Sequence, residues 1–252
     1  MTAPFDPAWL WPLIAAPFVG SFLGVVARRL PEGLPLALAR STCPHCGHRL
    51  GLRDLVPVLS WIVQRGRCRY CGAALGPFYP TVELAAVAAV AWAALAVPAA
   101  LMGPAVLLGW WLIALAAADA RSLVLPDALT LPLIVAGLAV TYAIAPEAIL
   151  HHALGAVAGF AVLALVALAY RRLRGREGIG LGDAKLAAAA GAWVSWTGLP
   201  GVLLIAAVLG LTAALLARAA GRRLTATTEV PFGPWLCLAT WIVWVHGPLA
   251  LG

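Results

Sequence analysis

Charged residues are scarce in this chain. Asp, Glu, Lys and Arg together make up 11% of its 252 residues, whereas hydrophobic residues make up 63%. An ordinary soluble domain has roughly 25% charged residues, so the composition excludes that class of protein. The apolar runs are long enough to cross the hydrocarbon core of a bilayer, which takes roughly 20 residues of helix. The sequence therefore predicts an all-α polytopic membrane protein.

Basic residues are also missing before the first apolar run, which is followed instead by Arg28 and Arg29. A secretory signal has the opposite arrangement, so we expect this run, from about Trp9 to Ala27, to remain as the first transmembrane helix. The run after Asp183 is short for a span, and we expect it to be tilted or partly sunken. In total, about eight helices are predicted. After the first, we expect them near 80–98, 105–120, 128–145, 152–170, 184–197, 200–217 and 233–250.

Lys and Arg are absent from every second loop. If the first helix runs from outside to inside, all 17 basic residues lie on the inner side, and the loops near 98–104, 146–150 and 198–200 have none. The positive-inside rule therefore makes the basic side cytoplasmic. The net charge of +7 then reflects topology and contact with the lipid bilayer, and we expect no binding of nucleic acid.

One substantial polar segment, over residues 31–79, separates the first two predicted helices. It contains two Cys-x2-Cys pairs with a 21-residue gap between them: Cys43, Cys46, Cys68 and Cys71. This spacing predicts one tetrahedral Zn²⁺ site, and four thiolates leave no open coordination position, so the metal is structural. Free thiols are the alternative interpretation.

Histidines in the same segment leave a second alternative, because His45 or His48 could replace a cysteine as ligand. The run from Asp54 to Val63 is apolar but too short to span, and we expect it at the membrane interface with Trp61 at headgroup level. The predicted organisation is a first transmembrane helix over 1–30, a cytoplasmic zinc segment over 31–79 and a transmembrane domain over 80–252.

Two carboxylates stand at the ends of apolar helices. Asp119 ends one run and Asp183 opens another, and the predicted topology places both at the cytoplasmic membrane face. A carboxylate at a membrane helix is costly and indicates function, and two that share a site can divide acid and base roles. This pattern predicts aspartyl proteolysis. Helix capping by Asp183 and an ion pair of Asp119 with Arg121 are the structural alternatives.

The residues around Asp183 suggest how a peptide substrate binds. Gly180 and Gly182 leave the backbone bare, so an extended peptide can approach closely. Lys185 is a further substrate-contact candidate, although a solvated interfacial charge explains it too. Asp127 follows Pro126 and is expected to cap a helix, and residues 231–234 form either a backbone wall near the aspartates or simply the start of a helix. A transporter also uses membrane carboxylates, but it needs them near the bilayer midplane.

Taken together, these motifs resemble those of the bacterial type IV prepilin leader peptidase/N-methyltransferase family, membrane aspartyl proteases of the Gly-x-Gly-Asp type. The matching stretches run in order over nearly the whole chain: 20–23, 29–31, 43–46, 54–61, 65–71, 79–83, 119 with 125–127, 180–185 and 231–234. The resemblance implies that Asp119 and Asp183 are the catalytic pair. It implies cleavage of prepilin or pseudopilin leaders of type IV pili and type II secretion at the inner face of the bacterial cytoplasmic membrane.

The resemblance also implies N-methylation of the new N-terminus with S-adenosylmethionine as donor. Two departures fall in the N-terminal half associated with that activity: Gly24 stands where the family usually has Asn, and Phe78 where it usually has Arg. We expect methylation to persist with weaker donor binding than in a member that has Asn and Arg. A peptidase without methyltransferase activity is the alternative.

Overall fold

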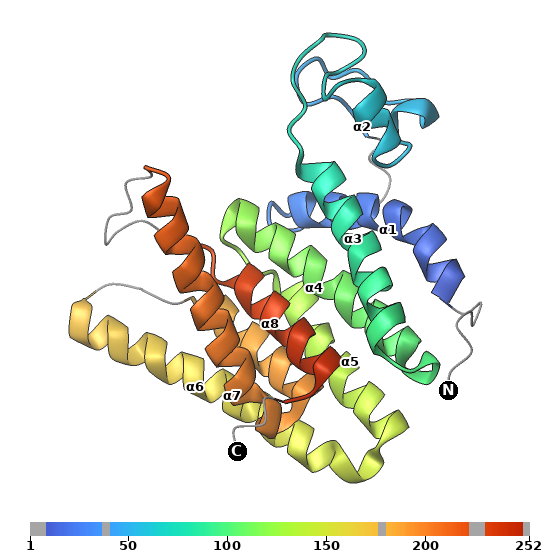
Figure 1. Ribbon diagram of the computed structural model, residues 1–252. Helices are drawn as coiled ribbons and strands as arrows, with labels where there is room; N and C mark the ends of the chain where they lie inside the picture. The colour runs from blue at the N-terminus through green and yellow to red at the C-terminus, as the bar shows by residue number, and fades with distance from the viewer. Residues whose placement is uncertain (1–8, 37–40, 176–179, 222–229, 249–252) are drawn as a thin grey trace. The chain divides into compact units, whose positions relative to one another are not determined.

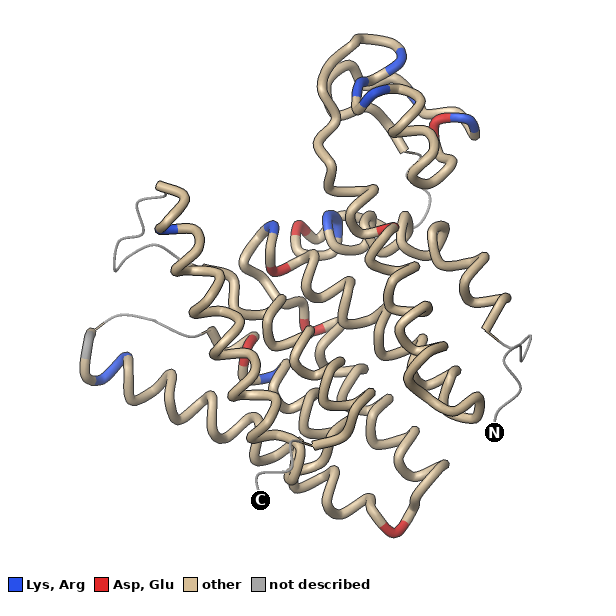
Figure 2. The backbone as a smooth tube through the Cα atoms, viewed as in Figure 1, with Lys and Arg blue, Asp and Glu red and all other residues tan. Residues whose placement is uncertain are grey.

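The computed structural model describes residues 9–36, 41–175, 180–221 and 230–248, which form helices joined by short connections (Figure 1). Six helices of this described part are long and apolar enough to cross a membrane. Along most of their length the helices carry no charge (Figure 2). Large apolar side chains lie exposed on them, such as Val157 at 68% and Leu211 at 63%. Lipid is the solvent that suits such surfaces.

The chain divides into two units, Met1–Ala117 and Ala118–Gly252, with the boundary inside helix α4. The first unit contains α1 (Leu10–Arg29), η2 (Leu52–Asp54), α2 (Leu59–Val63), α3 (Phe78–Ala96), η3 (Ala99–Leu101) and most of α4 (Met102–Ser122). The second contains the end of α4, then α5 (Asp127–Ile144), η4 (Pro146–Ala148), α6 (Ile149–Arg174), α7 (Leu181–Ala219) and α8 (Gly233–His246).

Glycine brings α1 and α3 together in the first unit. A Cβ atom at Gly20 would lie 2.6 Å from the Glu83 Cα, and one at Gly24 would lie 2.8 Å from the Tyr79 ring. The two glycines are four residues apart, so they share one face of α1 and let the helix backbones approach. Helix association in lipid depends on such close contact.

The long element α7 is two helices joined by a reversal at Ser195. This residue has φ 63° and ψ 177°, far from helical values, and its Oγ accepts the Thr197 N–H at 3.3 Å, as a cap of the second helix does. Gly198 lies against Val243 and Gly210 against Trp235, so the second helix runs antiparallel to α8. The structure therefore turns near the loop predicted at 198–200.

The reversal is needed to bring the start of α7, with Asp183, and its later part, with Gly210, to the same end of α8. Gly210 contacts the first turn of α8, and that turn also contacts Asp119 through Gly233. A straight helix from residue 183 to residue 210 would span about 40 Å at about 1.5 Å per residue. Two of the predicted spans thus lie within α7, and α8, with 14 residues, is shorter than a usual span. The predicted number of eight spans is not confirmed.

Two glycines of α6 make the contact with the first half of α7. A Cβ atom at Gly155 would lie 2.5 Å from the Gly191 carbonyl oxygen, and one at Gly159 would overlap the Ala187 carbonyl. Because these neighbours are backbone atoms, no side-chain rotation can relieve the overlap. The glycines therefore set the separation of α6 from the first half of α7, which carries Asp183.

We predict that Gly159→Val destabilises the protein by about 1–3 kcal/mol or more, because overpacking forces a backbone shift. Thermal unfolding in detergent measures the effect. Gly103→Val is the matched control, since a Cβ atom there has no neighbour within 4 Å. Equal melting temperatures for the two variants would contradict this account of the α6–α7 contact.

Candidate active site and metal centre

Asp119 lies one turn before the end of α4 and is 5% exposed. Its Oδ2 accepts the backbone N–H of Gly233, the first residue of α8, at 2.9 Å. A Cβ atom at position 233 would lie 2.7 Å from that oxygen, so only glycine permits the contact. The Pro-Phe-Gly-Pro stretch therefore does more than begin a helix, because it supplies a hydrogen-bond donor to the aspartate.

Asp183 stands in the first turn of α7 and is half-buried. The loop after α4 packs against this turn. Leu125, six residues after Asp119, lies on Gly182: its Cβ is 3.1 Å from the position that a Cβ atom at residue 182 would take. Asp119 is also close enough for its charge to act on Asp183. The structure thus brings together the two carboxylates that the sequence singled out.

The three substrate-contact candidates differ in their surroundings. Gly180 is exposed in an extended conformation, and no atom lies closer than 3.8 Å to its Cβ position. Gly182 is covered on that side by Leu125. Lys185 donates to Asp127 Oδ1 at 2.6 Å in an ion pair that is partly exposed. Asp127 is the first residue of α5 and makes no side-chain cap, so its predicted capping role is replaced by this pair.

The four predicted zinc ligands form one cluster. The Sγ atoms of Cys43, Cys46, Cys68 and Cys71 all lie within 4.8 Å of one another, and those of Cys43 and Cys71 are 3.9 Å apart. A tetrahedral Zn²⁺ with bonds of about 2.3 Å separates its sulfurs by about 3.8 Å, so the cluster fits the ion. None of the four is in a disulfide. His48 instead stacks on Tyr70, with ring centroids 3.6 Å apart.

The two halves of this cluster repeat one backbone motif, which is too short to stand out in the sequence. The N–H of Cys43 donates to His48 O, and the N–H of Cys68 donates to Ala73 O in the same way. Each turn then passes through a glycine in the left-handed region, Gly47 with φ 69° or Gly72 with φ 68°. Glycine adopts this conformation without a steric penalty, so both knuckles present their sulfurs alike.

The thiols differ in acidity before any metal is considered. Hydrogen bonds from the backbone N–H groups of Cys46 and His45 lower the pKa of Cys43 to about 6. At Cys71 a hydrogen bond from the Ala73 backbone favours the thiolate, but burial and the neighbouring sulfurs outweigh it and raise the pKa to about 11. Four adjacent sulfurs therefore resist full ionisation alone, and a divalent cation would supply the missing positive charge.

Known proteins match the chain over nearly its full length. A model described as the bacterial peptidase A24 N-terminal domain matches residues 14–97, and one described as the type IV leader peptidase family matches residues 106–215. A prepilin leader peptidase/N-methyltransferase of Burkholderia pseudomallei is 43% identical, with 86% of this chain and 79% of the relative covered. The chain belongs to the type IV leader peptidase family.

Further relatives of this family carry the same name. The Dickeya chrysanthemi protein is 41% identical, with 93% of this chain and 92% of the relative covered. The Aeromonas hydrophila protein is 38% identical, with 91% and 87% covered. No solved structure matches the chain significantly.

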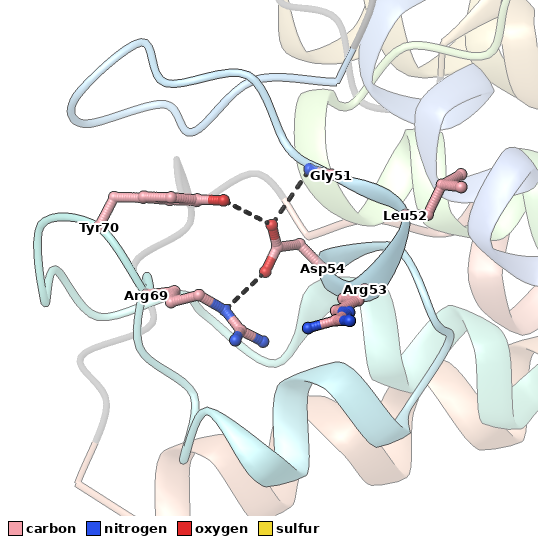
Figure 3. A pocket seen from close by; sticks show the side chains of 6 residues that line it. All are labelled: Gly51, Leu52, Arg53, Asp54, Arg69 and Tyr70. Atoms are coloured by element: carbon pink, nitrogen blue, oxygen red, sulfur yellow. Dashed lines mark hydrogen bonds and ion pairs between the residues drawn. The ribbon is translucent and has the colours of Figure 1, made fainter.

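One residue of this leader peptidase that sequence reasoning did not single out is Asp54. Its carboxylate is 5% exposed and accepts from Gly51 N at 3.1 Å, Tyr70 OH at 3.2 Å and Arg69 Nε at 3.0 Å (Figure 3). Burial raises the pKa of Asp54, but these hydrogen bonds outweigh it and hold the pKa below its usual value. The network fastens the second zinc knuckle to η2. The sequence signal for it was its place at the start of the matched stretch 54–61.

Glu83 is the second residue to which the sequence assigned no role, although it ends the matched stretch 79–83. It is buried in α3, and its Oε2 accepts the Val58 N–H at 2.7 Å. Val58 has φ 60° in a tight turn closed by a hydrogen bond from Leu59 N–H to Pro57 O. A β-branched residue is strained in that conformation, so the Glu83 contact anchors a strained turn of the zinc segment on α3.

Trp61 belongs to the same anchoring region. Its indole N–H donates to Leu75 O at 3.2 Å, and its ring lies against Gly66. The side chain is therefore engaged within the segment between the zinc knuckles and α3, whereas the sequence suggested a place at headgroup level. Leu59 and Ile62 of α2, exposed at 61% and 56%, are the apolar side chains that α2 turns outward.

We predict that the purified, reduced protein contains one Zn²⁺ per chain. Cys43→Ser should remove the metal and lower the melting temperature, because a structural zinc site contributes folding free energy directly. Elemental analysis with thermal unfolding measures both effects. Cys237→Ala is the control, since Cys237 is a buried cysteine that is not part of the cluster. A metal-free native protein with unchanged stability would rule out the zinc site.

Proposed function

We propose that this protein cleaves the leader peptides of type IV prepilins or pseudopilins with Asp119 and Asp183 as the catalytic pair. The observation that carries the proposal is the convergence of the two carboxylates beside Gly180 in a chain of the leader peptidase family. One aspartate, ionised, would activate a water molecule. The other, protonated, would polarise the scissile carbonyl and later give its proton to the leaving amine.

Hydrogen bonding supports a fixed geometry for the pair. The Gly233 N–H holds one oxygen of Asp119, which leaves the second oxygen for water or for Asp183. Asp183 lies in the first turn of α7, where the helix dipole favours a negative charge. Each carboxylate thus has a separate group that stabilises its ionised form, and repulsion between two negative charges at one site would keep a proton on one of them.

The loop between α4 and α5 supports binding of an extended, apolar peptide. Leu123 and Val124 directly follow α4 and expose 45% and 44% of their surfaces near the carboxylates. The N–H groups of Val124 and Leu125 donate to no other described backbone group. A peptide must leave its helix before its carbonyls can be attacked, and such a loop offers it both apolar contact and free donors.

We further propose that the protein methylates the new N-terminal amine, with S-adenosylmethionine as the methyl donor. The match of the N-terminal domain over residues 14–97 and the names of the relatives support this second activity. In the domain organisation that we propose, residues 31–79 form the zinc segment and residues 80–252 form the peptidase domain. Transport is not favoured, since no relative described above is a transporter.

Both departures from the family pattern lie against one aromatic side chain. The Cβ position of Gly24 is 2.8 Å from the Tyr79 ring, and the Phe78 ring packs on Tyr79 edge-on at 5.4 Å. Arg28 lies above the same ring at 5.8 Å. Asn at position 24 would therefore require Tyr79 to move, so Gly24→Asn with Phe78→Arg has to be tested as a pair.

Asp119→Asn and Asp183→Asn should each lower cleavage by at least about 100-fold, because a general acid or base contributes about 10²–10⁴ to the rate. Purified protein is incubated with a prepilin-like peptide, and the N-terminus of the product is sequenced. Glu147→Gln is the matched control, since it neutralises an exposed carboxylate on η4. Substantial cleavage by either Asn variant would refute the assignment.

The proposed inner-membrane location puts α6's basic C-terminal end in the cytoplasm and the η4 loop outside. A thiol-reactive, membrane-impermeant reagent added to intact cells should therefore label Glu147→Cys and leave Arg172→Cys unlabelled. Both positions are exposed, so access alone decides the result. Labelling of Arg172→Cys in intact cells would overturn the topology and the cytoplasmic placing of the active site.

A further inference from the structure

An ion pair joins the start of α5 to the start of α7, close to the two aspartates. Lys185 Nζ donates to Asp127 Oδ1 at 2.6 Å, and the two side chains are 30% and 57% exposed. Lys185 comes two residues after Asp183 in the same helix. Residues two apart on a helix point in different directions, so Lys185 and Asp183 do not face each other.

A second contact joins the same two segments. Leu125 is 8% exposed and lies on Gly182. Leu125 is two residues from Asp127, and Gly182 is three residues from Lys185, so one face of the first turn of α7 meets the loop twice. Two contacts fix both the distance and the rotation of that turn, whereas one contact would let it pivot. Asp183 lies between the two contact points in the sequence, so its direction is fixed with them.

The other end of this loop, over residues 123–126, is attached to Asp119. The backbone N–H of Leu123 donates to Asp119 O at 2.9 Å, as in the last turn of a helix. Four residues therefore connect the two carboxylates through the backbone and its contacts. One end of the loop lies on the turn that carries Asp119, and the other lies on the turn that carries Asp183.

The loop is held in a strained conformation. Leu123 has φ 55°, in the left-handed region, where a Cβ atom crowds the following carbonyl oxygen. Glycine would adopt this conformation without that penalty. A strained residue persists only where the surrounding contacts over-determine its conformation. The contact of Leu125 with Gly182 and the pair of Asp127 with Lys185 are the contacts that hold the far end of the loop.

We propose that Asp127 and Lys185 are positioning residues for peptide cleavage, because their ion pair holds the loop on α7 and keeps Asp119 and Asp183 at a reactive separation. The inference rests on the cleavage proposed above. Lys185 acts here through Asp127, within the protein, instead of making the substrate contact that the sequence suggested. A misplacement of about 1 Å at a catalytic site can lower a rate about 100-fold, so even a partly exposed ion pair has an effect at this place.

Positioning and substrate contact differ in their kinetics. Loss of a contact that the peptide makes equally before and during the reaction raises KM and leaves kcat unchanged. Loss of positioning lowers kcat, because the carboxylates spend less time in the reactive geometry, and it leaves the bound peptide's own contacts intact. The two roles of Lys185 can therefore be separated by measuring both constants.

The test is a double-mutant cycle on the full-length protein in lipid nanodiscs, with a prepilin-like peptide as substrate. Lys185→Met and Asp127→Asn should each lower kcat about fivefold with KM unchanged, which is the upper range for a partly exposed ion pair. The double variant should also lose about fivefold, because the second substitution removes a partner whose interaction is already lost. Lys185→Arg keeps the charge and should retain most of the native rate.

The matched control is Arg172→Gln, which removes an exposed positive charge near the C-terminal end of α6 and should keep the native constants. The pH dependence of cleavage separates positioning from a loss of folded protein. Two carboxylates that share a site titrate as a pair, and their repulsion separates the two limbs of the pH–rate profile. In Lys185→Met the carboxylates can move apart, so the limbs should lie closer together. A smaller folded fraction would lower the rate equally at every pH.

Native constants in both single variants, or multiplied losses in the double variant, would overturn the positioning role. A raised KM in Lys185→Met alone would overturn it in favour of a peptide contact, and an equal loss in Arg172→Gln would show an effect of charge in general. Absence of cleavage by the native protein, or native rates in Asp119→Asn, would instead overturn the proposed function itself.

Discussion

The hydrogen bond from the Gly233 N–H to Asp119 is the contact on which the candidate active site depends. A carboxylate that is 5% exposed among apolar helices has little access to water, so it needs a hydrogen-bond partner from the protein. The backbone N–H supplies that partner without adding a second charge. Because it comes from the first turn of α8, the same bond fixes where α8 begins relative to the end of α4.

Glycine makes this arrangement sterically accessible. Positions 155, 159 and 191 allow α6 to approach the first half of α7, and position 233 admits the aspartate itself. The reversal at Ser195 then returns the second half of α7 to the side of α8. In lipid, helices gain little from the hydrophobic effect among themselves, so close backbone contact becomes a major source of association. Small residues therefore concentrate around the site.

The segment that contains the four cysteines follows different rules, since it has little apolar core. Four sulfurs, the Asp54 network and the Glu83–Val58 bond hold it. Each of these joins parts of the chain that are far apart in sequence. Cross-links of this kind replace a hydrophobic core in a segment too small to build one.

The sequence by itself determined the membrane class, and it singled out the four cysteines that cluster and the two aspartates that the structure brings together. Each of these depends on composition or on spacing within a short stretch, which local chemistry governs. The tertiary structure alone decided that Gly233 binds Asp119 across 114 positions, that Leu125 covers Gly182, and that Glu83 holds Val58. Those contacts depend on how closely helices pack. Packing distance is set by many residues together, so no local pattern specifies it.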